Sequence, residues 1–419
     1  MEDWNQKFEL PLRFKQEKVI RWEECIPSTI NENHVDLWRG CPDYLPSHEF
    51  VTAIREVIRN GNVALHQYTK GSGHPRLLAV LAKLYSHLLH RDINPLDNIL
   101  VCFDIYGLMT NVILSNVTNG DEVIIVQPSS DFYEYIVRMA GGISKFVPLR
   151  LKQNITTPSS SSDWKLDDLE LEKVFNSKTK LIILSTPNYH VGKVYTIDEL
   201  EKICSLCKKW NVVCVSDESE EFLAYNPEQF TRIASLPEMW QRTITIGSFD
   251  STFFLKGWKI AWAYGPCNLL KNLETVHFNT VLTCPTPVQE AIASVFEKKY
   301  ENMDKNKMVF ADTINSLKLK KQLMFDTLRE VGLNPVKSES GIFIIADVSS
   351  LERSINYEEN NNFVEWLAKK AHVQAVPLCI FYQEEYKSNV THLVRFCFNR
   401  KEDTLRLARD RLQECFNGH

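Results

Sequence analysis

Features that direct a chain to a membrane, a nucleic acid or the secretory pathway are missing from these 419 residues. No apolar run approaches the roughly 20 residues that a membrane-spanning helix needs. The opening residues, MEDWNQKFELPLRFK, are acidic, aromatic and polar, so no signal peptide is expected. Basic residues are not in excess, because 48 Lys and Arg stand against 53 Asp and Glu, a formal net charge of −5. We therefore expect neither a nucleic-acid partner nor a membrane partner.

The cysteines lack the pairing of a disulfide framework or a metal site. The chain has 11 of them, and many lie inside apolar runs such as VVCVSDE and VRFCFN. Cys204 and Cys207 form one CxxC on a predicted helix with no second pair, which favours buried helix thiols over a metal or redox role. Reduced, buried thiols predict a cytoplasmic protein, and no metal is expected.

What the sequence does contain is an alternation of short apolar strands with helical stretches. One helix, 196–210, begins with a capping box formed by Thr196 and Glu199. The polar run 156–164 is interpreted as a surface loop. The alternation predicts an α/β fold with a mostly parallel sheet, whose ligand sites lie at the carboxyl ends of the strands. The strands are expected at 98–103, 121–128, 143–149, 179–187, 211–218, 243–248 and 259–266.

The last hundred residues have a different pattern. The segments SGIFIIADVSS, VQAVPLCIF and HLVRFCF are expected to form strands between helices, which indicates a smaller α+β unit. We therefore predict a large domain over 47–300 and a small C-terminal domain over 301–419. The N-terminal segment 1–46 lacks the strand–helix alternation and is expected to join the small domain.

The chain carries, in this order, segments such as GCPDYLP, HQYTKGSGHPRL, NGDEVIIVQPSSDFYE, TKLIILSTPN, VVCVSDE, GWKIAWAYGP and VRFCF. Together they resemble the fold-type I aminotransferases that use pyridoxal phosphate (PLP). Within that group they resemble the kynurenine aminotransferases, also called cysteine-conjugate β-lyases. The resemblance covers nearly the whole chain. It implies a mostly parallel seven-stranded sheet in the large domain, and a homodimer with each active site at the subunit boundary.

The reactive lysine of this family forms a Schiff base with PLP, which only a primary amine can do. The resemblance implies the pattern Ser-x-x-Lys, with a basic phosphate-binding residue eight positions after the lysine. Ser248 and Lys259 match the two ends of that pattern, and counting back from Lys259 places Ser251 at the lysine position. Lys256 lies five residues further on. We interpret it as a loop lysine, because the turn would have to be rebuilt for it to substitute.

The resemblance also implies altered contacts to the PLP ring. Asp217 matches the strand-end aspartate that holds the ring nitrogen and keeps it protonated. Glu220 replaces the tyrosine that hydrogen-bonds the ring oxygen. Asn188 is retained, whereas Tyr189 and His190 replace the Asn-Pro that follows it in the family.

The phosphate end is expected to differ as well. PLP phosphate sits at a helix N-terminus, where backbone N–H groups and the helix dipole attract an anion. Asp104 and Ile105 replace the two glycines found there in the family, and Asp104 can cap the helix itself. A carboxylate about 4 Å from the phosphate would oppose it by roughly 4 kcal/mol at an effective dielectric of ~20. Ser130 stands where the family stacks an aromatic ring on PLP.

The residues expected on the substrate side of the site match the family only in part. Arg395 matches the arginine that binds the substrate α-carboxylate, with an interdomain salt bridge as the alternative. Tyr68 matches the tyrosine that reaches the phosphate from the neighbouring subunit, and a packed interface tyrosine is its alternative. Trp38 replaces a glycine of the substrate pocket. Leu282 and Thr283 replace a Phe-His pair that the partner chain contributes.

These differences predict a dimeric, kynurenine aminotransferase-like pseudoenzyme that binds a small molecule or a protein, with PLP absent or held weakly and without a covalent bond. A heterodimer with an active relative is one version of this hypothesis. A second hypothesis is an enzyme that binds PLP or its amine form non-covalently, with His190, Glu220 or Lys256 carrying the proton. The third is ordinary kynurenine transamination, with Lys256 as the catalytic lysine.

Overall fold

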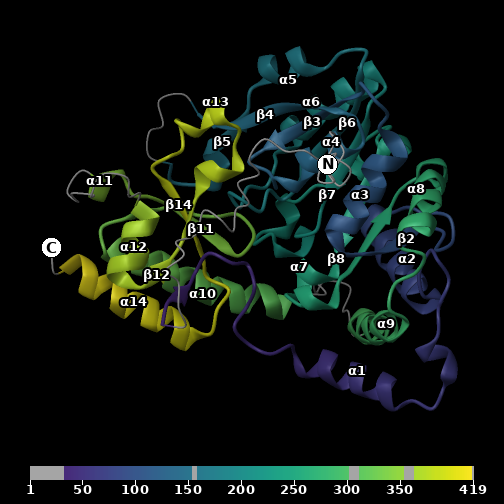
Figure 1. The fold of residues 1–419 in the computed structure, drawn as a ribbon, viewed down its shortest axis with the longest axis horizontal. Helices are drawn as coiled ribbons and strands as arrows, with labels where there is room; N and C mark the ends of the chain where they lie inside the picture. Colours follow the sequence, from purple (N-terminus) through teal and green to yellow (C-terminus); the bar gives the residue numbers. More distant parts are fainter. Residues whose placement is uncertain (1–32, 153–157, 302–310, 353–362, 418–419) are drawn as a thin grey trace, which may run out of the picture.

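The computed structural model describes residues 33–152, 158–301, 311–352 and 363–417. Within these ranges the strands form three sheets of eight, four and two strands. Figure 1 shows the large sheet with its helices on one side of the molecule and the smaller sheet, packed with α10, α12 and α14, on the other. None of the described helices is both long and apolar enough to cross a bilayer.

The large sheet has the strand order β2-β9-β8-β7-β6-β3-β4-β5. The pairs β3–β4, β3–β6, β6–β7 and β7–β8 are parallel, whereas β9 runs antiparallel to both β2 and β8. The predicted α/β fold class is confirmed, but the sheet has eight strands rather than seven. The strands are β2 (Ile99–Phe103), β3 (Glu122–Gln127), β4 (Ile143–Leu151), β5 (Trp164–Leu166), β6 (Thr179–Ser185), β7 (Val213–Asp217), β8 (Thr243–Ser248) and β9 (Ile260–Tyr264).

The eighth strand, β5, begins at the last residue of the run 156–164, and the interpretation of that run as a surface loop is wrong for its described part, 158–164. Within 158–164, Ser161, Asp163 and Trp164 are buried. The Ser161 hydroxyl donates to the Gly192 carbonyl at 2.8 Å, and Ser160 and Asp163 form a capping box over a short 3₁₀ turn. Hydrogen bonds within the protein therefore satisfy polar groups of this serine-rich run. Trp164 begins β5, which pairs antiparallel with β4.

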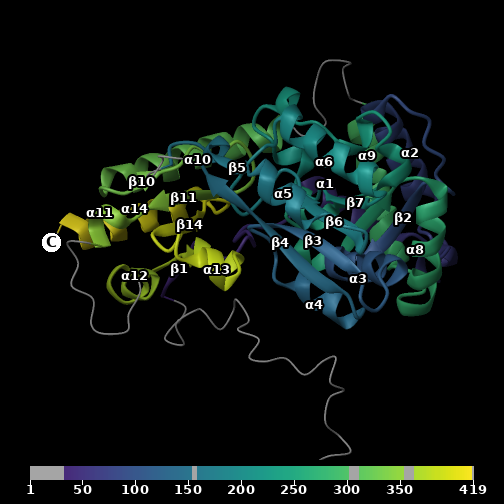
Figure 2. The same cartoon turned by 90° about the horizontal axis from the view of Figure 1, so that it is seen from above.

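Helices cover both faces of the large sheet, as Figure 2 shows. Successive residues of β3 alternate between two cores: Val123 and Ile125 pack with α3, α4 and α8, and Ile124 and Val126 pack with α6. Continuous apolar strands are the expected sequence pattern for a sheet buried on both faces. These helices are α1 (His48–Arg59), α2 (Pro75–Leu89), α3 (Asp104–Asn116), α4 (Phe132–Met139), α5 (Asp168–Val174), α6 (Ile197–Trp210), α7 (Phe249–Phe253), α8 (Cys267–Thr280) and α9 (Thr286–Glu301). The capping box predicted for α6 is present, with Thr196 and Glu199 bonding reciprocally.

The smaller sheet has the order β10-β11-β14-β13, and all of its pairs are antiparallel. Its central strand β14 brings Arg395 opposite Ile345 of β11. Near the start of the described chain, β1 (Val35–Asp36) pairs with β12 (Val373–Gln374), so this segment lies against the C-terminal elements. The remaining elements are β10 (Asn334–Pro335), β11 (Phe343–Asp347), β13 (Val376–Pro377), β14 (Leu393–Cys397), α10 (Ala311–Glu330), α11 (Ser349–Glu352), α12 (Phe363–Ala371), α13 (Glu384–Lys387) and α14 (Glu402–Asn417).

Candidate functional site

The predicted site residues gather at the carboxyl ends of the central strands. Asp217 is the last residue of β7, Ser248 is the last residue of β8, and Asp104 directly follows β2 at the start of α3. Arg395 reaches the same region from β14 of the smaller sheet, because one of its Nη groups lies 3.2 Å from Nδ1 of His190, five residues past the end of β6. Parallel strands bring their carboxyl ends to one edge, and this is where ligand sites of α/β sheets form.

Asp217 is held as a buried, hydrogen-bonded carboxyl group. It is 3% exposed, and its Oδ2 accepts a short hydrogen bond from the hydroxyl of Tyr133 on α4. Its Oδ1 accepts from the Ser219 backbone N–H at 3.1 Å. Burial raises the pKa of Asp217, and the bonds from Tyr133 and Ser219 oppose that rise.

The phosphate end of the predicted site contains an internal ion pair. The Lys259 ammonium lies against Oδ2 of Asp104, while Oδ1 of Asp104 accepts from the Gly107 N–H at 2.8 Å. The aspartate therefore caps α3, as predicted, and neutralises the neighbouring lysine at the same time. Asp104 has a φ of 57°, a left-handed conformation that favours glycine. Ile105 is half-buried and packs against the core beneath α3.

Ser248 and Ser251 bond to each other around the start of α7. Ser248 is the N-cap residue, and its side-chain oxygen accepts from the Ser251 backbone N–H at 3.2 Å. Ser251 is half-buried and brings no amine to this position. Lys256 is exposed and lies five residues further on, in the short turn that leads to β9.

The side chains of Tyr189 and Ser130 contact each other. Their side-chain oxygens form a short hydrogen bond, and the Tyr189 ring packs at 3.9 Å from the His190 ring. Burial raises the pKa of Tyr189, and nearby Arg395 opposes that rise. The neighbouring Asn188 is fully buried and is used structurally, because its Nδ2 donates to the Pro128 carbonyl at 3.0 Å.

Arg395 is buried without a carboxylate partner among the described residues. It is 6% exposed, and its guanidinium carbon lies 3.9 Å from the Phe343 ring centroid and 4.3 Å from that of Phe381. One Nη group lies 3.2 Å from His190 Nδ1, and Nε has no hydrogen-bond partner in the described chain. Burial lowers the pKa of Arg395 to about 10. It also lowers the pKa of His190 far below its usual value, so the imidazole is neutral at physiological pH.

Glu220 lies on the same side of the site. It is 8% exposed, and its Oε2 has no hydrogen-bond partner in the described part of the chain. Burial raises its pKa to about 7, which Lys256 and Arg395 oppose and Asp217 reinforces. A Cβ atom placed on Gly341 would lie 3.1 Å from this oxygen, so the backbone leading into β11 passes directly beside it.

Trp38 belongs to a loop that the buried Arg400 holds in place. The Trp38 side chain is 7% exposed and lies under the Arg39 guanidinium at 5.0 Å. Arg400 donates to the backbone carbonyls of Asp36, Arg39 and Cys41 and to the Asp36 carboxylate. The prediction that Trp38 fills the substrate pocket stays a prediction.

Tyr68 and the segment after α8 line a separate open groove. Tyr68 is 85% exposed, and the groove has a volume of about 790 Å³. Thr283 lines it with Phe103, while Leu282 has a left-handed φ of 68° and is 44% exposed. Neither Arg395 nor Glu220 lines this groove.

Comparison with known proteins decides the family. The family model described as Aminotransferase class I and II matches residues 32–412. The chain belongs to this family. It is 42% identical to kynurenine–oxoglutarate transaminase 3 of Bos taurus over 413 residues, which cover 96% of this chain and 90% of that one. It is 37% identical to kynurenine–oxoglutarate transaminase 1 of Homo sapiens, with 94% and 95% covered. Bna3p of Saccharomyces cerevisiae has the same fold, with a TM-score of 0.85 and 27% identity over 92% and 91% of the two chains.

Class I and II aminotransferases depend on PLP, and the residues of this chain that were predicted to surround the cofactor phosphate and ring have partners within the chain itself. The cation predicted to hold its phosphate is already paired with Asp104, and the helix end is already capped. The hydroxyl oxygen of Ser248, which matches the first residue of the family's Ser-x-x-Lys pattern, accepts from the Ser251 N–H. The Tyr189 side chain meets Ser130, at the position where an aromatic ring is expected to stack on the cofactor.

Three contributions to this aminotransferase-like site were missed by sequence reasoning. Tyr133 binds Asp217, and its place in the SSDFYE run close to Ser130 was the available signal. Gly341 brings the backbone beside Glu220, which nothing in its local sequence indicates. Asp250 is 7% exposed, accepts from the Ile260 N–H at 3.3 Å, and has a pKa raised to about 7 by burial.

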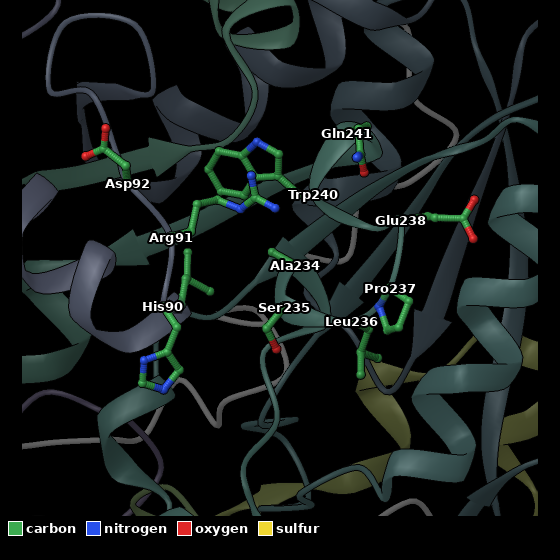
Figure 3. Close-up of a pocket in the computed structure, with 11 residues that line it drawn as sticks. His90, Arg91, Asp92, Ala234, Ser235, Leu236, Pro237, Glu238, Trp240 and Gln241 are labelled. Carbon is green, nitrogen blue, oxygen red and sulfur yellow. The ribbon is translucent and has the colours of Figure 1, made fainter.

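A second pocket of the aminotransferase fold lies near the opposite edge of the large sheet. It has a volume of about 440 Å³ and lies between the end of α2 and the segment before β8. Figure 3 shows the Arg91 side chain beside the Trp240 indole, and its guanidinium carbon is 5.0 Å from the ring centroid. No predicted site residue lines this pocket. Across the described ranges, no group of three His, Cys, Asp or Glu could hold a metal, and Cys204 and Cys207 are both buried in α6.

Proposed function

We propose that this kynurenine aminotransferase-like protein binds a small carboxylate ligand and does not transaminate through a lysine–PLP Schiff base. The family and the fold are established. The loss of lysine chemistry is our proposal, and so are the absence of tightly bound PLP and the ligand class.

The observation that carries the proposal is the ion pair between Lys259 and Asp104. A phosphate at this helix end would have to displace the Asp104 carboxylate from both the Lys259 ammonium and the Gly107 N–H. Two like charges about 4 Å apart oppose each other by roughly 4 kcal/mol at an effective dielectric of ~20. Ser251 adds to this cost, because a hydroxyl cannot form an imine with the cofactor aldehyde.

Arg395 supports the ligand-binding half of the proposal. A guanidinium buried to this degree is costly unless an anion accompanies it. Its planar fork matches a carboxylate better than a lysine would, because two parallel N–H···O bonds can form. The Phe343 and Phe381 rings fix its orientation, so a ligand carboxylate would meet a preorganised partner.

We also propose that the protein is a cytoplasmic dimer, formed with itself or with an active relative. The exposed Tyr68 and the open groove beside it support a subunit boundary on that face. The free, mostly buried cysteines of the described chain support a reducing compartment. Size-exclusion chromatography with light scattering tests the dimer, and a monomer at micromolar concentration would contradict it.

A second candidate is an active kynurenine–oxoglutarate transaminase, and the names of the relatives favour it. In this candidate Lys256 replaces the missing lysine. A Cβ placed on Gly40 would lie 3.1 Å from the Lys256 Nζ, so this amine lies next to the loop that carries Trp38 and Gly40.

One experiment separates the two candidates. The full-length chain is incubated with PLP, reduced with borohydride and mapped by mass spectrometry, and the kynurenine and 2-oxoglutarate reaction is assayed in parallel. The matched control is Lys256→Ala. We expect no site-selective adduct and no turnover above the Lys256→Ala background. A reducible adduct on Lys256, with turnover that Lys256→Ala abolishes, establishes the transaminase instead.

A further inference from the structure

Glu218 points away from the predicted site residues and into a buried polar cluster between α2 and the large sheet. It directly follows Asp217, and successive side chains at the end of a strand face opposite sides of a sheet. Asp217 binds Tyr133 on one side, whereas Glu218 lies with Tyr264 of β9 on the other. Glu218 is 0% exposed and Glu221 is 4% exposed, so two buried carboxyl groups share this cluster.

Glu221 takes the guanidinium of the cluster for itself. Nε of Arg232 donates to Glu221 Oε2 at 3.0 Å, and Nη2 forms a second, shorter hydrogen bond to the same oxygen. The Tyr85 hydroxyl of α2 donates to Glu221 Oε1, because the Trp262 Nε1–H already donates to the Tyr85 oxygen at 2.9 Å. Glu221 is therefore the carboxyl group that carries the negative charge of the cluster.

Glu218 is left without a cation of its own. The nearest nitrogen of Arg232 lies 3.7 Å from Glu218 Oε2, and the described residues offer no other ion pair to this carboxyl group. Its remaining contacts are hydroxyl groups, with Ser216 at 2.8 Å from Oε1 and Tyr264 at 3.4 Å from Oε2. A second buried charge beside one shared cation is costly. Burial raises the pKa of Glu218 to about 8, which Arg232 opposes and Glu221 reinforces.

A protonated Glu218 also completes the hydrogen bonding of its neighbours. Thr245 of β8 and Tyr264 of β9 are paired in register, and Thr245 opposes the rise in the pKa of Tyr264 that burial causes. Oγ1 of Thr245 is buried and has no hydrogen-bond partner within the described ranges. If Glu218 donates a proton to the Tyr264 oxygen, the Tyr264 hydroxyl is free to donate to Thr245. An ionised Glu218 would keep the Tyr264 proton for itself.

We propose that Glu218 is the proton-binding group of a pH-sensitive latch that holds α2 to the large sheet. Tyr85 of α2 makes this contact, because its ring centroid lies 4.1 Å from that of Tyr264 and its hydroxyl binds Glu221. When the contact opens, water reaches the cluster, Glu218 ionises and its proton passes to the solvent. Opening becomes easier as pH rises, because a state that has lost a proton is favoured at higher pH.

The other titratable groups of the cluster keep one charge state through the neutral range. Burial raises the pKa values of Cys214, Tyr85 and Tyr264 far above their usual values, so all three stay neutral. Burial opposes the cationic form of Arg232, but neighbouring acidic groups raise its pKa above the usual value, and it stays charged. Glu218 is therefore the group whose protonation changes when the latch opens.

Hydrogen–deuterium exchange of the full-length protein at pH 6 and pH 8 tests the latch. Burial raises the pKa of Glu218 from 4.5 to about 8, so the latch is strongest below pH 4.5 and weakens as pH rises to about 8. After correction for the intrinsic exchange rate, the protection of the α2 N–H groups should fall about tenfold or more between the two pH values. Glu218→Gln keeps the shape and stays neutral, so its α2 protection should change little. Glu228→Gln, at an exposed residue, is the control and should follow the wild type.

Each result either supports or overturns the latch. Equal α2 protection at both pH values in the wild type overturns it without any variant, so the test survives if Glu218→Gln fails to fold. An undiminished fall in a folded Glu218→Gln variant overturns it as well, because another group then carries the proton. In Glu221→Gln, Arg232 is free to pair with Glu218, which should ionise, and the pH dependence of α2 should disappear. A dependence that persists in this variant contradicts the assignment of the cation to Glu221.

Discussion

The ammonium of Lys259 and the carboxylate of Asp104 form an ion pair at the first turn of α3, where Asp104 also caps the helix. One side chain thus supplies the negative charge that a helix N-terminus attracts. The first way to test the cofactor-binding capacity of this aminotransferase-like protein is therefore to remove the Asp104 carboxylate.

The Asp104→Gly substitution should increase the affinity for PLP and for inorganic phosphate. It removes the competing carboxylate, frees Lys259, and places glycine at a residue whose φ is 57°. Since the opposing charge is worth roughly 4 kcal/mol at 4 Å, a gain of about tenfold or more is expected. Isothermal titration measures it. Asp104→Asn is the matched control for charge without backbone relief, and an unchanged affinity in both variants contradicts the role given to Asp104.

Adding a lysine at position 251 should restore a covalent bond only when the phosphate end is also open. We expect a borohydride-reducible PLP adduct on residue 251 in Ser251→Lys combined with Asp104→Gly, and little adduct in Ser251→Lys alone. The reason is that an imine needs a primary amine beside a cofactor that is already held. Mass spectrometry locates the adduct. Modification of Lys256 instead of residue 251 in the double variant would contradict the assignment of position 251 to the family's lysine position.

Protein stability should fall as pH rises from about 4.5 to 7 because of Glu220. Its usual pKa of 4.5 is raised to about 7 by burial, so the folded protein holds a proton in this window that the unfolded chain has lost. By linkage this amounts to about 3 kcal/mol of unfolding free energy lost across the window. Urea unfolding of Glu220→Gln should therefore show a shallower pH dependence. The exposed Glu228→Gln is the control and should follow the wild type.

Replacing Arg400 by lysine should destabilise the loop that carries Trp38. The Arg400 guanidinium is 1% exposed and donates to three backbone carbonyls, which a single ammonium cannot reach together. We expect a loss of about 3 kcal/mol in unfolding free energy by urea titration. Arg406→Lys, on the exposed face of α14, is the control and should change little, because its partner Glu402 is also exposed.

The sheet was predictable from the sequence because its strands carry one simple pattern. Ile124 and Ile125 face opposite cores, so a continuous apolar run implies burial on both faces. The start of α6 was equally predictable from the sequence, since Thr196 and Glu199 cap it through local contacts. The extra strand β5 was missed because the serines before it looked solvated, and only the tertiary bond from Ser161 to Gly192 buries them.

The candidate site was predictable residue by residue but not in its pairings. The resemblance to the family identified Asp104 and Lys259 as site residues, and the position of Asp104 directly after a strand predicted that it caps the following helix. Their ion pair joins residues 155 positions apart, and no local signal reports such a contact. The same holds for Glu220 and Gly341, which meet only because the backbone before β11 crosses the end of β7.

The contact between Tyr189 and Ser130 joins the segment after β3 to the segment after β6. Their side-chain oxygens touch, so a larger side chain at position 130 would collide with Tyr189. The two positions therefore share one volume, and the size of the side chain at either one limits the size that fits at the other.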